Sequence, residues 1–103
     1  MTSKWEGAIG LCLRARQCVS GVYAVQMAVK KGEAYLVLLD PDTAPQSRDA
    51  MDSLCRAAGV PLRTLPEAGV LAHLTSKANR KFLAVVDRQF ALMIEAQLPQ
   101  DKI

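Results

Sequence analysis

Residues 22–39 combine a helical repeat of apolar side chains with an uninterrupted apolar run. In the first part, apolar side chains recur at intervals of three or four residues, at Val22, Val25, Ala28 and Val29. This spacing predicts a helix over 22–31, with Ser20 as a candidate N-cap and Gly32 as a left-handed C-terminal cap. The second part, 35–39, is apolar at every position, which is typical of a strand covered on both faces. We expect this helix and this central strand to organise the domain.

Two further helices are expected on either side of this pair, one over 4–16 and one from Pro45 to Ala58. The first carries a broad apolar stripe, and the second begins with a proline, which suits the first turn of a helix. Residues with favourable capping chemistry stand at their ends: Ser3 with Glu6 before the first, Asp42 or Thr43 before the second, and Gly59 after it. These residues predict where the two helices begin and end.

The second half of the sequence predicts two more strands and two more helices. Residues 60–65 indicate a short strand, and Pro61 at its start suggests either the entry of the strand or a sheet edge. A short helix is expected over 66–74, and the polar loop 75–81 follows it. Residues 82–86 form a second apolar run and hence a second buried strand. The last helix carries its apolar face at Phe90, Met93, Ile94 and Leu98.

Residues 18–20 are too short for more than one strand-like bridge. Helices and strands alternate along the sequence, and this order is typical of α/β proteins. We predict a three-layer α/β/α sandwich around a small mixed four-stranded sheet, in one domain spanning 1–103, with 99–103 as a flexible tail. The positions expected to be largely buried are Leu36, Val37, Leu38, Leu83, Val85 and Val86. Burying such side chains contributes about 1.5–3 kcal/mol each.

Composition places few limits on partners. The 103 residues are 50% hydrophobic, enough for one core without cross-links, and the net charge of +3 permits an anionic partner without requiring one. Cys12, Cys18 and Cys55 form no Cys-x-x-Cys pair and predict free thiols, not a disulfide framework or a metal site. No apolar run has the ~20 residues of a membrane span and no leader pattern is present, so we expect a cytoplasmic protein without cofactors.

Asp40 and Asp42 follow the central strand, as in phosphatases that use one Asp as nucleophile and a second as general acid. That pattern requires Thr or Val at the position of Ala44, and no downstream Lys and acidic pair completes a magnesium site. We therefore interpret Asp-Pro-Asp-Thr as a turn and helix cap, and we expect no enzymatic activity. His73 is expected at the surface or in packing and not as a catalytic base.

Several segments keep a recognisable order and spacing: 10–15, 19–21, 28–32, 36–39, Cys55 with 59–61, 79–80 leading into 82–87, and 90–91. In these segments the chain resembles the bacterial YlxQ-like branch of the ribosomal-protein superfamily named after seven-Ae and thirty-e. The resemblance covers roughly residues 7–96. It implies an α/β/α sandwich and a small cytoplasmic protein associated with kink-turn RNA.

In kink-turn binders of this superfamily, the helix after the Gly21 position begins with an Asn-Glu pair and has a Lys three residues after the Glu. The matching positions here are Tyr23, Ala24 and Met27, which supply no amide, carboxylate or ammonium. Only Tyr23 keeps a polar group and a ring for stacking. The resemblance therefore implies RNA binding with weakened kink-turn specificity.

Phosphate contacts need only cations, exposed backbone N–H groups and a helix N-terminus. By the resemblance, RNA would meet the fold at the bend around Gly21 and at the loop 76–81, with the cations of Arg14 and Arg16 on the same side. The RNA-binding residues so implied are Arg14, Arg16, Ser20, Gly21, Val22, Tyr23, Met27, Ser76, Lys77, Arg80 and Lys81. The expected partner is structured RNA, with ribosomal RNA as one candidate, and the expected role is that of a non-catalytic ribosomal or ribosome-associated protein.

A second hypothesis assumes the same fold but a protein partner instead of RNA. Val22, Tyr23 and Met27 could form an apolar patch for another protein or for a second copy of this chain. The lysines and arginines would then only solvate the ends of helices and strands. Exposure of Tyr23 and Met27 without basic neighbours would favour this interaction module, whereas basic neighbours would favour RNA.

Overall fold

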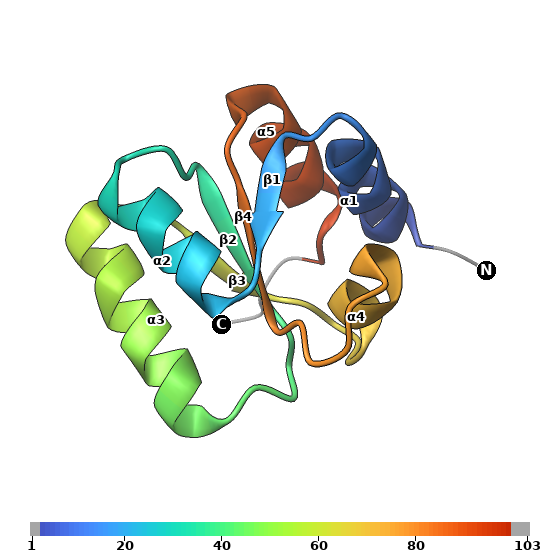
Figure 1. The fold of residues 1–103 in the computed structure, drawn as a ribbon. Coiled ribbons are helices and arrows are strands. Elements are labelled where there is room, and N and C mark those ends of the chain that lie inside the picture. The colour runs from blue at the N-terminus through green and yellow to red at the C-terminus, as the bar shows by residue number, and fades with distance from the viewer. Residues whose placement is uncertain (1–2, 100–103) are drawn as a thin grey trace.

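The computed structural model of the protein describes residues 3–99. Helices and strands alternate along the chain in the expected order (Figure 1). The elements are α1 (Lys4–Arg14), β1 (Cys18–Ser20), α2 (Val22–Lys30), β2 (Leu36–Leu39), α3 (Pro45–Ala58), β3 (Leu62–Thr64), α4 (Val70–Thr75), β4 (Phe82–Val85) and α5 (Arg88–Gln97). The predicted α/β class is therefore confirmed.

The four strands form one mixed sheet in the order β1-β4-β2-β3. Strand β4 is antiparallel to both of its neighbours, whereas β2 and β3 are parallel. Every residue of the two central strands, β2 and β4, is buried. The short outer strand β3 is partly exposed, as expected for an edge strand.

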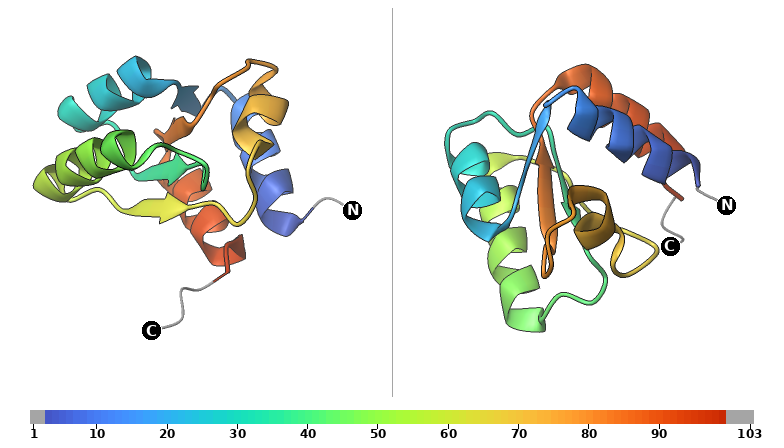
Figure 2. Two further views of the ribbon diagram at one scale, coloured as in Figure 1. Left: turned by 90° about the horizontal axis from the view of Figure 1, so that it is seen from below. Right: turned by 45° about the vertical axis from the view of Figure 1, so that its right-hand side comes forward.

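Helices cover both faces of this sheet, as the right-hand view of Figure 2 shows. Along the central strands, successive side chains alternate between two cores. The core shared with α1, α4 and α5 contains Leu36, Leu38, Leu83 and Val85. The core shared with α2 and α3 contains Val37, Leu39, Phe82 and Ala84. Because both faces are covered, every position of these strands has to be apolar, and this is the physical origin of the two uninterrupted runs.

Several predicted helix ends are confirmed. The hydroxyl of Ser3 accepts a hydrogen bond from the backbone N–H of Glu6 at the start of α1. Pro45 occupies the first turn of α3. Gly32 and Gly59 follow α2 and α3 with φ of +75° and +72°, the left-handed conformation expected after a helix.

Two predicted N-caps and one predicted helix start are wrong, each for a different local reason. Ser20 does not cap α2, because it remains in β1 opposite Leu83 and the N-cap is Gly21. Neither Asp42 nor Thr43 caps α3, whose N-cap is Ala44, because the Thr43 hydroxyl donates back to the Asp40 carbonyl at 2.6 Å. Helix α4 begins at Val70 instead of Pro66, after Gly69 adopts a φ of +84°.

The burial prediction is confirmed for five of its six positions, which are Leu36, Val37, Leu38, Leu83 and Val85. Val86 is only half-buried because it lies just beyond the end of β4. The expected flexible tail falls mostly on 100–103, which lie outside the described residues. No helix in the described part of the chain is both long and apolar enough to cross a membrane.

Candidate nucleic-acid interface

The bend at Gly21 and the loop 76–81 lie together at one end of the sheet. The backbone N–H of Gly21 donates to the carbonyl of Phe82 at 3.0 Å, which fixes the start of α2 beside the start of β4. The loop 76–81 leads directly into β4, so it reaches the same end of the sheet. The structure therefore brings together the two segments that the sequence singled out.

The side chain of Arg80 lies against the backbone of Gly21. A Cβ atom placed on Gly21 would stand 3.1 Å from Cζ of Arg80 and closer still to Nη1. Gly21 is buried and has a φ of +95°, a conformation that other residues rarely adopt. The backbone geometry therefore favours glycine at this position, and a side chain here would also displace the guanidinium of Arg80.

Positive charge gathers at the start of α2 without an internal counterion. No side chain caps this helix and no acidic residue occurs in its first turn. The first N–H groups of a helix lack intrahelical partners and carry a partial positive charge. The guanidinium of Arg80 is added to this positive end, and its Nε is buried without a hydrogen-bond partner among the described residues. An anion at this point would be attracted by the helix N-terminus and by the arginine.

The loop between α4 and β4 is shaped by two residues in the left-handed conformation. Ser76 ends α4 with a φ of +56°, and Asn79 has a φ of +64°. Asparagine tolerates this conformation better than most residues. Ser76, Lys77 and Asn79 are exposed, whereas Arg80 is partly buried by its contact with Gly21. The loop thus presents one free ammonium group close to a fixed guanidinium.

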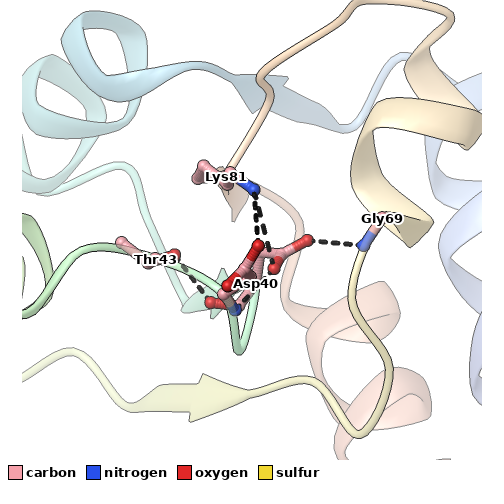
Figure 3. A network of polar contacts seen from close by, with 5 residues as sticks. Asp40, Thr43, Gly69 and Lys81 are labelled. Carbon is pink, nitrogen blue, oxygen red and sulfur yellow. Dashed lines mark hydrogen bonds and ion pairs between the residues drawn. The ribbon is translucent and has the colours of Figure 1, made fainter.

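Lys81 is placed differently from the other two cations of the loop. Its ammonium lies 4.0 Å from a carboxylate oxygen of Asp40 and 3.9 Å from one of Asp42 (Figure 3). These two carboxylates compensate part of its charge. Lys81 is therefore a weaker candidate for a phosphate contact than Lys77 or Arg80.

Asp40 organises the turn that follows β2. Its side chain is 1% exposed, and its two oxygens accept hydrogen bonds from the backbone N–H groups of Asp42 at 2.7 Å and Gly69 at 2.8 Å (Figure 3). The carboxylate thereby ties β2 to the segment before α4. Both oxygens are engaged by backbone donors, so the turn part of the interpretation is confirmed, whereas the helix-cap part is wrong. Within residues 3–99, no group of three or more metal-ligating side chains comes together.

Arg14 and Arg16 do not join this surface. They precede β1, whose N-terminal end is fixed to the far end of β4 by the bond from the Val86 N–H to the Gln17 carbonyl at 2.9 Å. Gly21 instead follows the C-terminal end of β1, beside the start of β4. The prediction that these two arginines lie on the same side as the loop 76–81 is therefore wrong, because β1 separates them from it.

The apolar residues at the start of α2 are exposed to different degrees. Tyr23 is 74% exposed and Val22 is 47% exposed, whereas Ala24 and Met27 are half-buried. Tyr23 and Met27 are four residues apart and share a helix face. Because Arg80 contacts the adjacent Gly21, this exposed face has a basic neighbour.

The structure is a small α/β/α domain in which Arg80 adds positive charge to the uncapped start of α2. The model of the ribosomal protein L7Ae/L30e/S12e/Gadd45 family matches residues 3–93. The chain is 32% identical over 88 residues to the RNA-binding protein YlxQ of Bacillus subtilis (strain 168), covering 85% of this chain and 88% of that protein. The chain therefore belongs to the ribosomal protein L7Ae/L30e/S12e/Gadd45 family.

Solved structures agree with the fold. A protein of unknown function from Bacillus halodurans C superposes with a TM-score of 0.86 at 27% identity, over 93% of this chain and 97% of that one. The 15.5kD RNA binding protein of Giardia lamblia superposes with a TM-score of 0.74 at 14% identity, over 91% of this chain and 84% of that one. The second likeness concerns the fold alone.

Proposed function

We propose that this protein binds structured RNA through the start of α2 and the loop 76–81, mainly by phosphate contacts and without catalysis. The observation that carries the proposal is the guanidinium of Arg80 held against Gly21 at an uncapped helix N-terminus. A phosphate placed there would receive charge-assisted hydrogen bonds from the arginine and from backbone N–H groups. The relative from Bacillus subtilis, named as an RNA-binding protein, supports the same class of ligand.

Two further side chains complete the proposed interface. Lys77 is exposed in the same loop as Arg80 and can reach a neighbouring phosphate as a mobile point charge. Tyr23 is the most exposed aromatic side chain described at this end, and its ring can stack on an unpaired base. These contacts favour bent or looped RNA over a regular duplex, because only unstacked bases offer a face to the ring.

We propose weak selectivity for kink-turns. Tyr23, Ala24 and Met27 occupy the positions of the Asn-Glu-x-x-Lys group that reads sheared guanines in kink-turn binders of this superfamily. None of the three can donate or accept as that group does, apart from the tyrosine hydroxyl. Affinity from phosphate contacts would persist while base readout is lost. Within this proposal the RNA is ribosomal and the protein acts in the cytoplasm as a ribosome-associated factor.

The exposed pair Val22 and Tyr23 gives the alternative a concrete basis. Side chains that are 47% and 74% exposed could anchor a protein partner or a second copy of the chain. The adjacent Arg80 gives this face a basic neighbour, which favours RNA. The two hypotheses differ in their response to salt, since an apolar contact gains little from counterion release.

The test is RNA affinity measured against salt concentration for the wild type and for Lys77→Ala with Arg80→Ala. Loss of two phosphate contacts should lower the slope of log affinity on log salt by between about 1 and 2. Lys31→Ala is the matched control, because Lys31 is an exposed cation at the opposite end of α2. Lys81→Ala should change the slope less than the double variant does. Absence of salt-dependent RNA binding in the wild type would reject the proposal in favour of the protein-interaction module.

A further inference from the structure

Helices α1 and α5 lie side by side (Figure 1). An open groove of about 410 Å³ is lined by residues of these two helices. The groove is lined along its length by Gly7, Leu11 and Met93, and Lys4 and Arg14 mark the first and last residues of α1. Leu11 is 47% exposed and lies at the centre of this lining. A hollow of this kind, with an exposed leucine between two cations, has the composition of a protein-binding surface.

The structure of residues 3–99 does not explain why position 7 is a glycine. Glycine inside a helix lowers helix stability relative to alanine. A Cβ atom on Gly7 would meet no heavy atom within 4 Å, so no contact of the chain requires its absence. Since Gly7 lines the groove, the missing side chain leaves room for close approach by another chain.

The charged residues that line the groove favour a negatively charged binding partner. Lys4 and Arg14 are exposed, and neither forms an ion pair with any residue of the described chain. The carboxylates of α1 and α5 are engaged elsewhere: Glu6 at the start of its own helix and Glu95 with an arginine of β3. Among residues 3–99, no carboxylate lines the groove, and Gln97 is its one uncharged polar side chain. The described surface is therefore mainly apolar between two cations.

We propose that this groove binds an acidic amphipathic helix of a protein partner. Lys4 and Arg14 are ten residues apart on α1, a distance of about 15 Å or about three helical turns. A partner helix with carboxylates three turns apart and apolar residues at helical spacing between them matches this arrangement. No aromatic ring on which a base could stack is among the described residues that line the groove. It is distinct from the proposed RNA interface, because Gly21 and Arg80 lie at the other end of β1 and do not line it.

The probe is a synthetic amphipathic helix of about 18 residues with leucines on one face and two glutamates three turns apart. A second peptide carries lysines in place of the glutamates. Added to the full chain labelled with ¹⁵N, the glutamate peptide should bind and shift amide signals of α1 and α5 only. Lys4→Glu with Arg14→Glu should weaken its binding by about tenfold or more and should reverse the preference between the two peptides.

Gly7 and Gly10 provide a matched pair of variants, because both lie in α1 with free space at the Cβ position and only Gly7 lines the groove. Gly7→Ala and Gly10→Ala should both raise the midpoint of thermal unfolding, and only Gly7→Ala should weaken peptide binding. Equal binding of the two peptides, or shifts confined to another surface, would overturn the proposal. A wild-type dimer that the charge-reversal variant breaks would also overturn the proposal, because the groove would then bind a second copy of the chain. Shifts on α1 and α5 caused by RNA would overturn it as well, because the groove would then bind RNA.

Discussion

The guanidinium of Arg80 occupies the space into which a side chain at Gly21 would project. The two residues are far apart in the sequence and are brought together by the antiparallel pairing of β1 with β4, which places Ser20 opposite Leu83. The guanidinium of Arg80 thereby lies beside the positive end of α2. A cation already placed there would lose less conformational entropy if an anion bound.

Gly21→Ala should weaken RNA binding and destabilise the fold together. The φ of +95° would strain a residue with a Cβ by about 1–3 kcal/mol. The new methyl group would also push the guanidinium of Arg80 away from the helix N-terminus. Denaturant unfolding measures the first effect, and RNA titration at fixed salt measures the second.

Gly32→Ala separates these two effects. Gly32 also has a positive φ, of +75°, but a Cβ there would meet nothing within 4 Å. This variant should therefore lose stability through backbone strain alone and keep the RNA affinity of the wild type. If both variants lose RNA affinity equally, the contact between Arg80 and Gly21 has no specific role in binding.

Asp40→Ala should lower the free energy of unfolding by about 3 kcal/mol, because hydrogen bonds to a charged group contribute about 1.5–3 kcal/mol each. Its carboxylate is 1% exposed and bonds to the N–H groups of both Asp42 and Gly69. Asp42→Ala is the control, since the Asp42 side chain is 80% exposed. This second substitution should change stability by less than about 0.5 kcal/mol. Similar values for both variants would show that the Asp40 bonds contribute little.

The central part of the fold could be predicted because burial on both faces leaves a direct trace in the sequence. The runs 36–39 and 82–85 are apolar at every position, and a run of this length between amphipathic helices is typical of a strand covered on both faces. The N-cap of α3 and the start of α4 could not be predicted in the same way. They depend on Asp40, whose carboxylate reaches Gly69 across 29 residues of sequence, and a contact of that kind has no local signature.

Individual residues of the candidate site could be predicted from the sequence, but their arrangement in space could not. Gly21 and Arg80 were singled out separately, but their contact depends on the register of β1 against β4. Arg14 and Arg16 have the same chemistry as Arg80 and lie at the wrong end of β1. Composition identifies cations, whereas strand direction decides which of them share a surface. Gly69, which holds Asp40 in place, was missed because its role is that of a backbone donor.

Because of Cys55, the free energy of unfolding should fall as the pH rises from 9 towards 11. Burial, with a smaller contribution from Asp52, raises the pKa of the Cys55 thiol from 9.0 to about 11. The contribution of the protonated thiol to the free energy of unfolding is fully present below pH 9 and is lost as the pH rises towards 11. The reason is that the thiol loses its proton at a lower pH in the unfolded chain than in the folded chain. Over this range the wild type should lose on the order of 2 kcal/mol more than Cys55→Ala. Parallel curves from denaturant unfolding at several pH values would contradict this assignment.

Restoring the side chains of the superfamily should change the selectivity of RNA binding more than its strength. The variant combines Tyr23→Asn, Ala24→Glu and Met27→Lys on α2, where Tyr23 is 74% exposed and the other two are half-buried. Each good base contact would favour a kink-turn over a plain duplex by about 1–3 kcal/mol, by analogy with readout of duplex DNA. The new glutamate lies in the first turn of α2, where it can pair with Arg80 and compete with phosphate, so affinity for the duplex should fall.

The control for this variant places glutamine at the same three positions, which supplies hydrogen-bonding groups without charge. It should gain less kink-turn preference than the restored variant, because it lacks the carboxylate and ammonium of the original group. Competition between a kink-turn and a duplex of equal length, measured at one salt concentration, separates readout from phosphate attraction. If the wild type binds neither RNA and the restored variant gains no preference, the exposed face formed by Val22, Tyr23 and Met27 belongs to a protein partner instead.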